Sequence, residues 1–134
     1  MRHPILVLPT TSGKWSVKSD AFRGDSWFGS TDGIHTVAVH FKQFIGRLHI
    51  QGTLAHDPQE EDWFDIVLNG GPVCCTGSYL QFDEAISGAY AFTFMGNFLY
   101  LRAVMDRDYI SSIESIQRER LLEHGDIDKV ILSL

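Results

Sequence analysis

Apolar and polar residues alternate along much of this chain, and the alternation is clearest over residues 34–54. Two runs there each place their apolar residues on one side, namely Val37, Val39 and Phe41, and then Leu48, Ile50 and Leu54. Because successive side chains of a strand point to opposite faces, this pattern predicts strands of a sheet with one buried face. Gly46 lies between the two runs and marks a bulge, a tight bend or a short connection.

Shorter segments with alternating or continuous apolar residues occupy much of the remaining chain. They are residues 5–8, 14–18, 63–68, 73–76, 78–82, 89–94, 98–105 and 127–134. Turn residues separate them, as in Asp32-Gly33 and the Asn-Gly-Gly-Pro sequence of residues 69–72. Many short strands at close spacing are typical of sandwiches and barrels. We therefore predict an all-β fold, an antiparallel, jelly-roll-like β-sandwich of about eight strands.

Residues 111–124 depart from the two-residue period. Ser111 followed by Glu114 fits a helix capping box, and Gly125 suits the end of a helix. Ile113, Ile116 and Leu121 form an imperfect helical stripe. These features predict one short helix near the C-terminus, in an insert at about residues 109–125 that precedes the last strand. Residues 1–134 are expected to form a single domain around this arrangement.

Composition narrows the classes of partner. The chain has 134 residues, of which 44% are hydrophobic, and its formal net charge is −6. A negative net charge argues against nucleic acid or an anionic membrane as the main partner, because both favour clustered Lys and Arg. No apolar run approaches the length of a membrane span. Pro4 and Pro9 interrupt the short apolar run at the start, which we interpret as a first strand rather than a signal peptide.

The two cysteines, Cys74 and Cys75, are adjacent. Neighbouring cysteines rarely bridge each other, so we expect no structural disulfide and synthesis in a reducing cytosol. They are either two small buried residues of a strand or a vicinal redox pair.

The ionisable residues show no established catalytic or metal-binding motif. None of the histidines lies in a zinc-binding spacing, although His40 and His49 could meet across a hairpin as metal ligands or as surface or interface residues. Five acidic residues form either a solvated loop or hard oxygen ligands for calcium, but without EF-hand spacing. They are Asp57, Glu60, Glu61, Asp62 and Asp65. No serine lies in a nucleophile elbow. We therefore predict no catalytic residue, no metal and no cofactor.

Two groups of residues are candidates for binding. Phe22, Trp27 and Phe28 lie in a segment rich in Gly, Ser and Asp, where they plug one end of the sandwich or form a contact surface for a sugar or a subunit. Arg47 and His49 lie on the polar side of the second central run, which faces either solvent or an interface.

Two longer segments resemble a known family. They are GRLHIQGTLAHDPQEEDWFDIVL at residues 46–68 and FTFMGNFLYLRAVMD at residues 92–106. These segments are similar to small β-sandwich structural proteins of T4-like tailed bacteriophages, especially phages of marine cyanobacteria. The shared pattern is a strand ending in Gln-Gly-Thr-Leu, a loop with proline and acids, an Asp-Trp-Phe strand start, a Gly-Asn-Phe turn and a late apolar strand at residues 129–132.

The resemblance implies a virion component without catalytic activity, made in the host cytoplasm. Its partners would be itself, as a homo-oligomer, and other virion proteins, with no nucleic acid and no membrane. Related arrangements of strand, glycine, loop and tryptophan also occur in discoidin-like and carbohydrate-binding sandwiches. The alternative function is therefore a carbohydrate-binding module that recognises host-surface glycans, with residues 22–28 as its candidate site.

Overall fold

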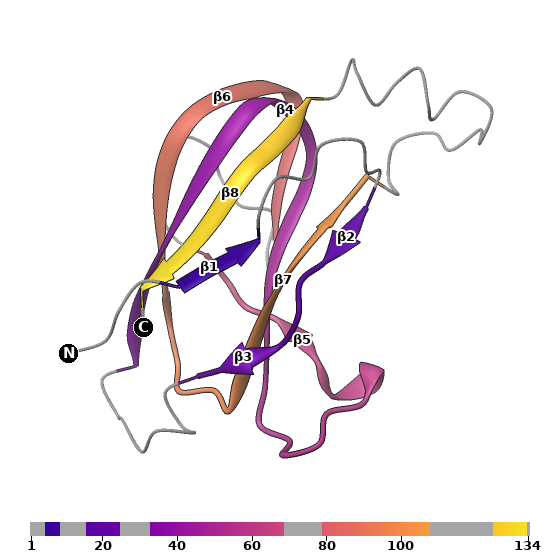
Figure 1. The fold of residues 1–134 in the computed structure, drawn as a ribbon, viewed down its shortest axis with the longest axis vertical. Coiled ribbons are helices and arrows are strands. Elements are labelled where there is room, and N and C mark those ends of the chain that lie inside the picture. The colour runs from indigo at the N-terminus through magenta and orange to yellow at the C-terminus, as the bar shows by residue number, and fades with distance from the viewer. Residues whose placement is uncertain (1–4, 9–15, 25–32, 69–78, 108–124, 134) are drawn as a thin grey trace.

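The computed structural model describes residues 5–8, 16–24, 33–68, 79–107 and 125–133, and these form one antiparallel sheet of eight strands (Figure 1). The strands are β1 (Ile5–Leu8), β2 (Val17–Lys18), β3 (Phe22–Arg23), β4 (Ile34–Thr53), β5 (Phe64–Asp65), β6 (Leu80–Met95), β7 (Tyr100–Asp106) and β8 (Asp126–Ser133). A single 3₁₀ turn, η1 (Glu60–Asp62), precedes β5. Within the described residues, no helix has the length and apolar character needed to cross a bilayer.

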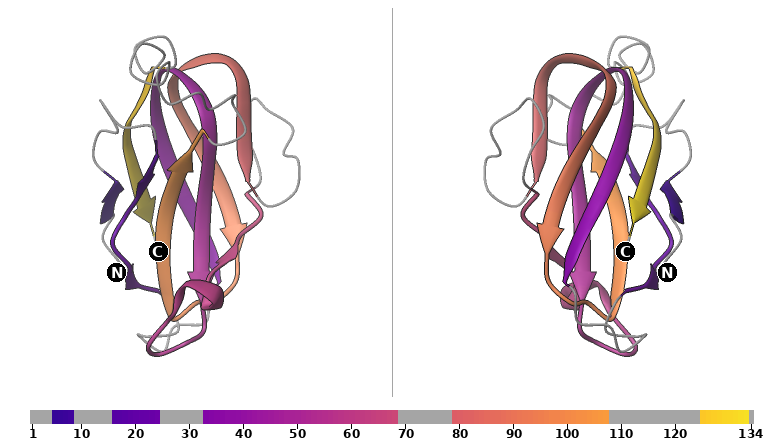
Figure 2. Two further views of the ribbon diagram at one scale, coloured as in Figure 1. Left: turned by 90° about the vertical axis from the view of Figure 1, so that its right-hand side faces the viewer. Right: turned by 90° about the vertical axis from the view of Figure 1, so that its left-hand side faces the viewer.

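The 20-residue strand β4 organises the sheet. One of its edges pairs with β6, from Ile34 opposite Met95 to Leu48 opposite Leu80. Its other edge pairs first with β8 and then, beyond the middle of the strand, with β7. Because β4 changes partner along its length while β6 follows it, the sheet curls around its own apolar side (Figure 2).

A bulge in the middle of β4 produces the bend. Lys42 and Gln43 are both exposed, so the buried positions change from odd numbers up to Phe41 to even numbers from Phe44. The pairing with β6 shifts register at this point, and Gln43 has a φ of 51°. At Gly46, a Cβ would lie 2.6 Å from the ring of Phe44, so only glycine fits there. The two predicted central runs are thus one strand with a bulge.

The core fills the inside of the curl with side chains from both halves of the long strands. Phe41 packs against Phe44 and Phe82 with ring centroids 5.7 and 5.0 Å apart. Phe92 and Leu101 are also fully buried. Burial of aromatic rings dominates the energetics of such a core, so the bend is stabilised by the rings that it brings together.

The all-β, antiparallel fold predicted from the sequence is confirmed. The described strands, however, form one curled sheet that resembles a half-barrel rather than two clearly separate sheets, because β4 continues through the bend as one strand and belongs to both halves. Of the strand predicted at residues 14–18, the structure shows Val17–Lys18, and residues 14 and 15 lie outside the described residues. The strand predicted at residues 73–76, the cysteines Cys74 and Cys75, and the helix predicted within residues 109–125 lie outside the described residues, except Gly125.

Candidate functional site

The outer surface of the curled sheet has two parts with opposite character. The first, which we call the polar face, covers the second half of β4 and β7, with neighbouring residues of β2, β5, the start of β6 and the loop before β5. Its members are Lys18, Arg47, His49, Gln51, Glu60, Asp65, Gln81, Arg102 and Asp106.

His49 lies at the centre of the polar face, between two carboxylates. Its Nδ1 is 3.1 Å from Oδ1 of Asp65, and its Nε2 is 2.6 Å from Oδ2 of Asp106. Burial lowers the pKa of His49, but the hydrogen bond to Asp106 and the charges of both carboxylates outweigh it and leave the pKa above its ordinary value of 6.5. Only the protonated ring can donate from both nitrogens, so this geometry stabilises an imidazolium.

The loop between β4 and β5 folds back onto the same face. Glu60 accepts hydrogen bonds from Nη1 of Arg102 at 3.0 Å and from Nζ of Lys18 at 2.6 Å, which lower the pKa of Glu60 to about 2. The guanidinium of Arg102 lies 4.3 Å from the ring centroid of Trp63 and donates to Gln51 at 2.7 Å. The acidic loop is therefore attached to the sheet through Glu60.

The ionisable groups of the polar face do not converge on a common point. Asp65 and Asp106 lie on opposite sides of the His49 ring, and the described residues contain no group of three or more His, Cys, Asp or Glu side chains placed to hold a metal ion. His40 does not meet His49 across a hairpin, because both lie on β4; His40 instead pairs with Ala89 and Lys129.

An open depression of about 400 Å³ lies beside the polar face. It is lined by Ser16, Val17, Lys18, Val104, Met105 and Asp106. The carboxylate of Asp106 already binds His49, and Lys18 binds Glu60, so the charged groups of the depression are engaged within the molecule.

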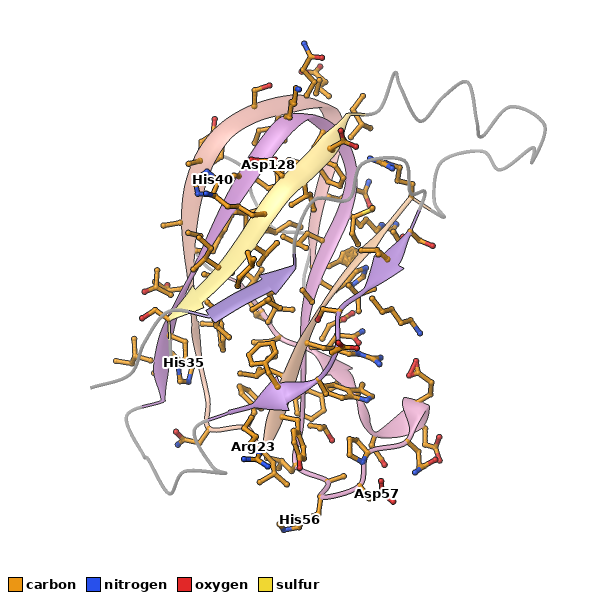
Figure 3. All side chains as sticks on the ribbon, viewed as in Figure 1. Arg23, His35, His40, His56, Asp57 and Asp128 are labelled. Atoms are coloured by element: carbon orange, nitrogen blue, oxygen red, sulfur yellow. The ribbon has the colours of Figure 1, made fainter. Side chains whose placement is uncertain are left out.

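The second part of the outer surface, which we call the plain face, covers β1, β8, the first half of β4 and the second half of β6. Its members stand in cross-strand rows and are Leu6, Ile34, Thr36, Ala38, His40, Ala89, Ala91, Thr93, Met95, Lys129, Ile131 and Ser133. Three large apolar side chains are well exposed: Leu6 at 58%, Ile34 at 64% and Met95 at 73%. His40 and Lys129 are the ionisable members, and Figure 3 shows His40 close to Asp128 at one end of the face.

The predicted binding residues have different locations. Arg47 and His49 do share the polar face, where Nε of Arg47 donates to Gln81 at 2.8 Å and its guanidinium lies 4.5 Å from the Tyr79 ring. Phe22 lies on β3 and is a partly buried residue that packs against the hydrophobic core. Trp27 and Phe28 lie outside the described residues.

Sequence reasoning missed several residues of the polar face. Arg102 and Asp106 were not candidates, although the two-residue period along β7 places them on the same side. Convergence of His40, His49, His56 and Asp57 in a cleft would indicate an enzyme. His56 and Asp57, however, are exposed in the loop at the opposite end of the sheet from His40 (Figure 3). The four residues therefore do not form a cleft.

Comparisons with protein-family models, with curated proteins and with solved structures find no match to this chain. The resemblance to phage structural proteins therefore stays a prediction based on the two sequence segments.

Proposed function

We propose that this protein is a non-enzymatic structural or assembly component of a tailed-phage virion and acts through protein–protein contacts. Its partners are further copies of itself and other virion proteins. The observation that carries the proposal is the plain face, a broad outer surface of small and apolar side chains on the curled sheet.

The composition of the plain face suits a protein interface. The centres of such interfaces are depleted in Lys, Glu and Asp, and contiguous exposed apolar patches mark interaction sites. Only Lys129 among the members of the plain face carries a permanent charge. On the plain face, the cross-strand row of Ala91, Ala38 and Ile131 is a surface against which another backbone can pack closely.

The polar face supports the same proposal because its composition differs from that of the plain face. Its charged side chains pair with one another, as in the contacts of His49 with Asp65 and Asp106 and of Arg102 with Glu60. A chain that pairs its charges internally on one face and leaves another face nearly uncharged is suited to assembly.

The finer fold is part of the proposal. The bend of β4 and β6 brings the two halves of the sheet around one core, an arrangement that supports the jelly-roll-like sandwich expected for small virion proteins. The sequence segments that resemble phage proteins, with the net charge of −6, further support a virion location after synthesis in the host cytoplasm, without nucleic acid or membrane as partner.

Purified particles of the phage that encodes this protein provide the test. We expect quantitative mass spectrometry to find the protein at a fixed number of copies per particle, and antibody labelling to place it on the virion by electron microscopy. Its absence from particles that contain the other virion proteins would contradict the proposal. If the protein is absent from particles and binds saturably to an oligosaccharide array, the carbohydrate-binding alternative would be favoured.

A further inference from the structure

We propose that β6 pairs edge to edge with β6 of a second copy of this chain, antiparallel and across a two-fold axis. Two curled sheets would thereby become one continuous sheet, and their plain faces would join. This inference rests on the proposed function and names the surface and the partner through which the protein first assembles.

β6 is the long open edge of the described sheet. It has 16 residues and pairs with β4 along one side, while no described strand pairs with its other side (Figure 1). The strands at the other margins are much shorter, with four residues in β1 and two residues in β2. In an antiparallel strand the backbone N–H and C=O groups of every second residue point to the same side, so β6 presents a row of donors and acceptors there.

The second half of β6 lacks the features that normally protect an edge strand. Such strands carry Lys, Pro or a bulge, or they are very short. Residues 89–95 read Ala-Tyr-Ala-Phe-Thr-Phe-Met and contain no charge, no proline and no glycine. They pair with β4 without a register shift, from Ala89 opposite His40 to Met95 opposite Ile34. A straight, neutral segment with high β-propensity is a template for another strand.

The first half of β6 is less suited to pairing. Gly88 has a φ of 110°, and the register against β4 shifts on the far side of this glycine. Glu84 is exposed in this half. The bend and the charge limit an added strand to residues 89–95.

The side chains of residues 89–95 fit a second copy in particular. A two-fold axis places the segment opposite itself, so an interface requires a self-compatible sequence. Because the segment is uncharged, no like charges meet across the seam. Phe92 and Phe94 point into the core, and the outer side carries mainly the small residues Ala89, Ala91 and Thr93. Two backbones can therefore approach to the strand spacing of about 4.8 Å without a clash.

A pair of matched variants tests the seam. Ala91→Lys with Thr93→Lys places two charges on β6, and in the pairing proposed these face the same charges of the second copy. Leu6→Lys with Ser133→Lys places two charges on β1 and β8, at exposed positions of the same plain face that are separated from β6 by at least one strand. Sedimentation equilibrium measures the dimer dissociation constant of each, and circular dichroism confirms that each variant folds.

We expect a dimer for the wild-type chain, at least about tenfold weaker association for the β6 variant, and a change below about threefold for the control. Amide hydrogen exchange on the wild-type chain gives an independent readout. Residues 89–95 should exchange more slowly as the protein concentration rises from micromolar to millimolar. This readout decides the question if the β6 variant does not fold.

Three results would overturn edge pairing. They are a wild-type monomer at millimolar concentration, exchange at residues 89–95 that does not depend on concentration, and a control variant that dissociates while the β6 variant does not. The third result would indicate face-to-face stacking and leave the assembly function standing. Absence of the protein from virions would refute the proposed function while the dimer remained.

Discussion

Arg107 offers the sharpest test of how the curled sheet is held together. This arginine follows β7 and is fully buried, with 0% of its surface exposed. Its Nε donates to the carbonyl of Ile45 at 2.8 Å, and its Nη2 donates to the carbonyl of Gly125 at 2.6 Å. Its guanidinium also lies 5.2 Å from the ring centroid of Phe44. One side chain thus joins the bend of β4 to the start of β8.

Replacing Arg107 by methionine removes both hydrogen bonds and retains much of the apolar volume. A hydrogen bond that involves a charged group contributes about 1.5–3 kcal/mol, so the two together give about 3–6 kcal/mol. Part of this loss is offset because methionine has no buried charge to desolvate. We therefore expect Arg107→Met to lower the free energy of unfolding by about 2–4 kcal/mol. A domain of ordinary stability, about 5–15 kcal/mol, still folds after such a change.

Urea unfolding followed by circular dichroism measures this loss. With a slope of about 2 kcal/mol per molar urea, the midpoint of Arg107→Met should fall by about 1–2 M. The urea midpoint of Arg107→Lys should lie between those of the wild type and Arg107→Met, because an ammonium cannot span both carbonyls as the guanidinium does. Lys42→Met removes an exposed cation from the same bend and should leave the midpoint nearly unchanged. A midpoint for Arg107→Met at or above that of the wild type would refute the role of the guanidinium and assign the bend to aromatic packing alone.

Three further predictions concern the polar face and the bend. Because the folded-state pKa of His49 is raised, the stability that its protonation provides is complete below about pH 6.5 and is lost as pH rises through the folded-state value. The urea midpoint of the wild type should therefore fall as pH rises through this range. The same fall in a His49→Gln variant would contradict the role of His49. The pKa of Glu60, about 2, lies below its ordinary 4.5, so the stability that its ionised carboxylate provides is present above pH 4.5 and is lost as pH falls towards 2. In Arg102→Met, the pKa of Glu60 measured by NMR should shift towards 4.5. An unchanged pKa would rule out the pairing of Glu60 with Arg102. Gly125 has a φ of 61°, and an added Cβ would overlap the carbonyl oxygens of the β4 bulge, so Gly125→Ala should lose more than about 1 kcal/mol of stability. Gly88 has a φ of 110°, but an added Cβ there would make only ordinary van der Waals contacts with the Tyr90 ring, so Gly88→Ala should lose less in thermal unfolding. Equal losses would exclude the overlap as the cause.

The two-residue period predicted which side chains point inward on both halves of β4, but it was wrong for Leu54, which follows the end of the strand and is 65% exposed. Within β4 the period succeeded because alternation is a local property of a strand, and Val37 and Leu48 each occupy the buried side that the period assigns to them. The bulge is also visible in this pattern, because the buried positions change from odd to even numbers between Phe41 and Phe44. From the sequence, Gly46 could mark a bulge, a tight bend or a short connection. The register of β4 against β6 shifts between Phe44 and Gly46 while β4 continues as one strand, so Gly46 belongs to the bulge.

The two-residue period does not predict which strands pair with one another. His49 and Asp106 are 57 residues apart, and they meet because β7 pairs with the second half of β4. Similarly, Arg107 follows a polar strand end in the sequence and gives no sign of being buried. The carbonyls of Ile45 and Gly125, to which it donates, come from the β4 bend and from the residue before β8. Contacts between distant segments depend on strand order, which alternation does not encode.

The position of the loop before β5 connects this fold to the proposed assembly. That loop returns onto the polar face, where Glu60 binds Arg102 and Lys18, and no described segment covers the plain face. Apolar surface gains more from burial than a charged surface does, because charges must lose their water. A monomer selected only for stability would place a loop over exposed side chains such as Ile34 and Met95. The loop covers the charged face instead, and the described residues leave uncovered the apolar face and the edge of β6 beside it, which is the arrangement that the proposed assembly requires.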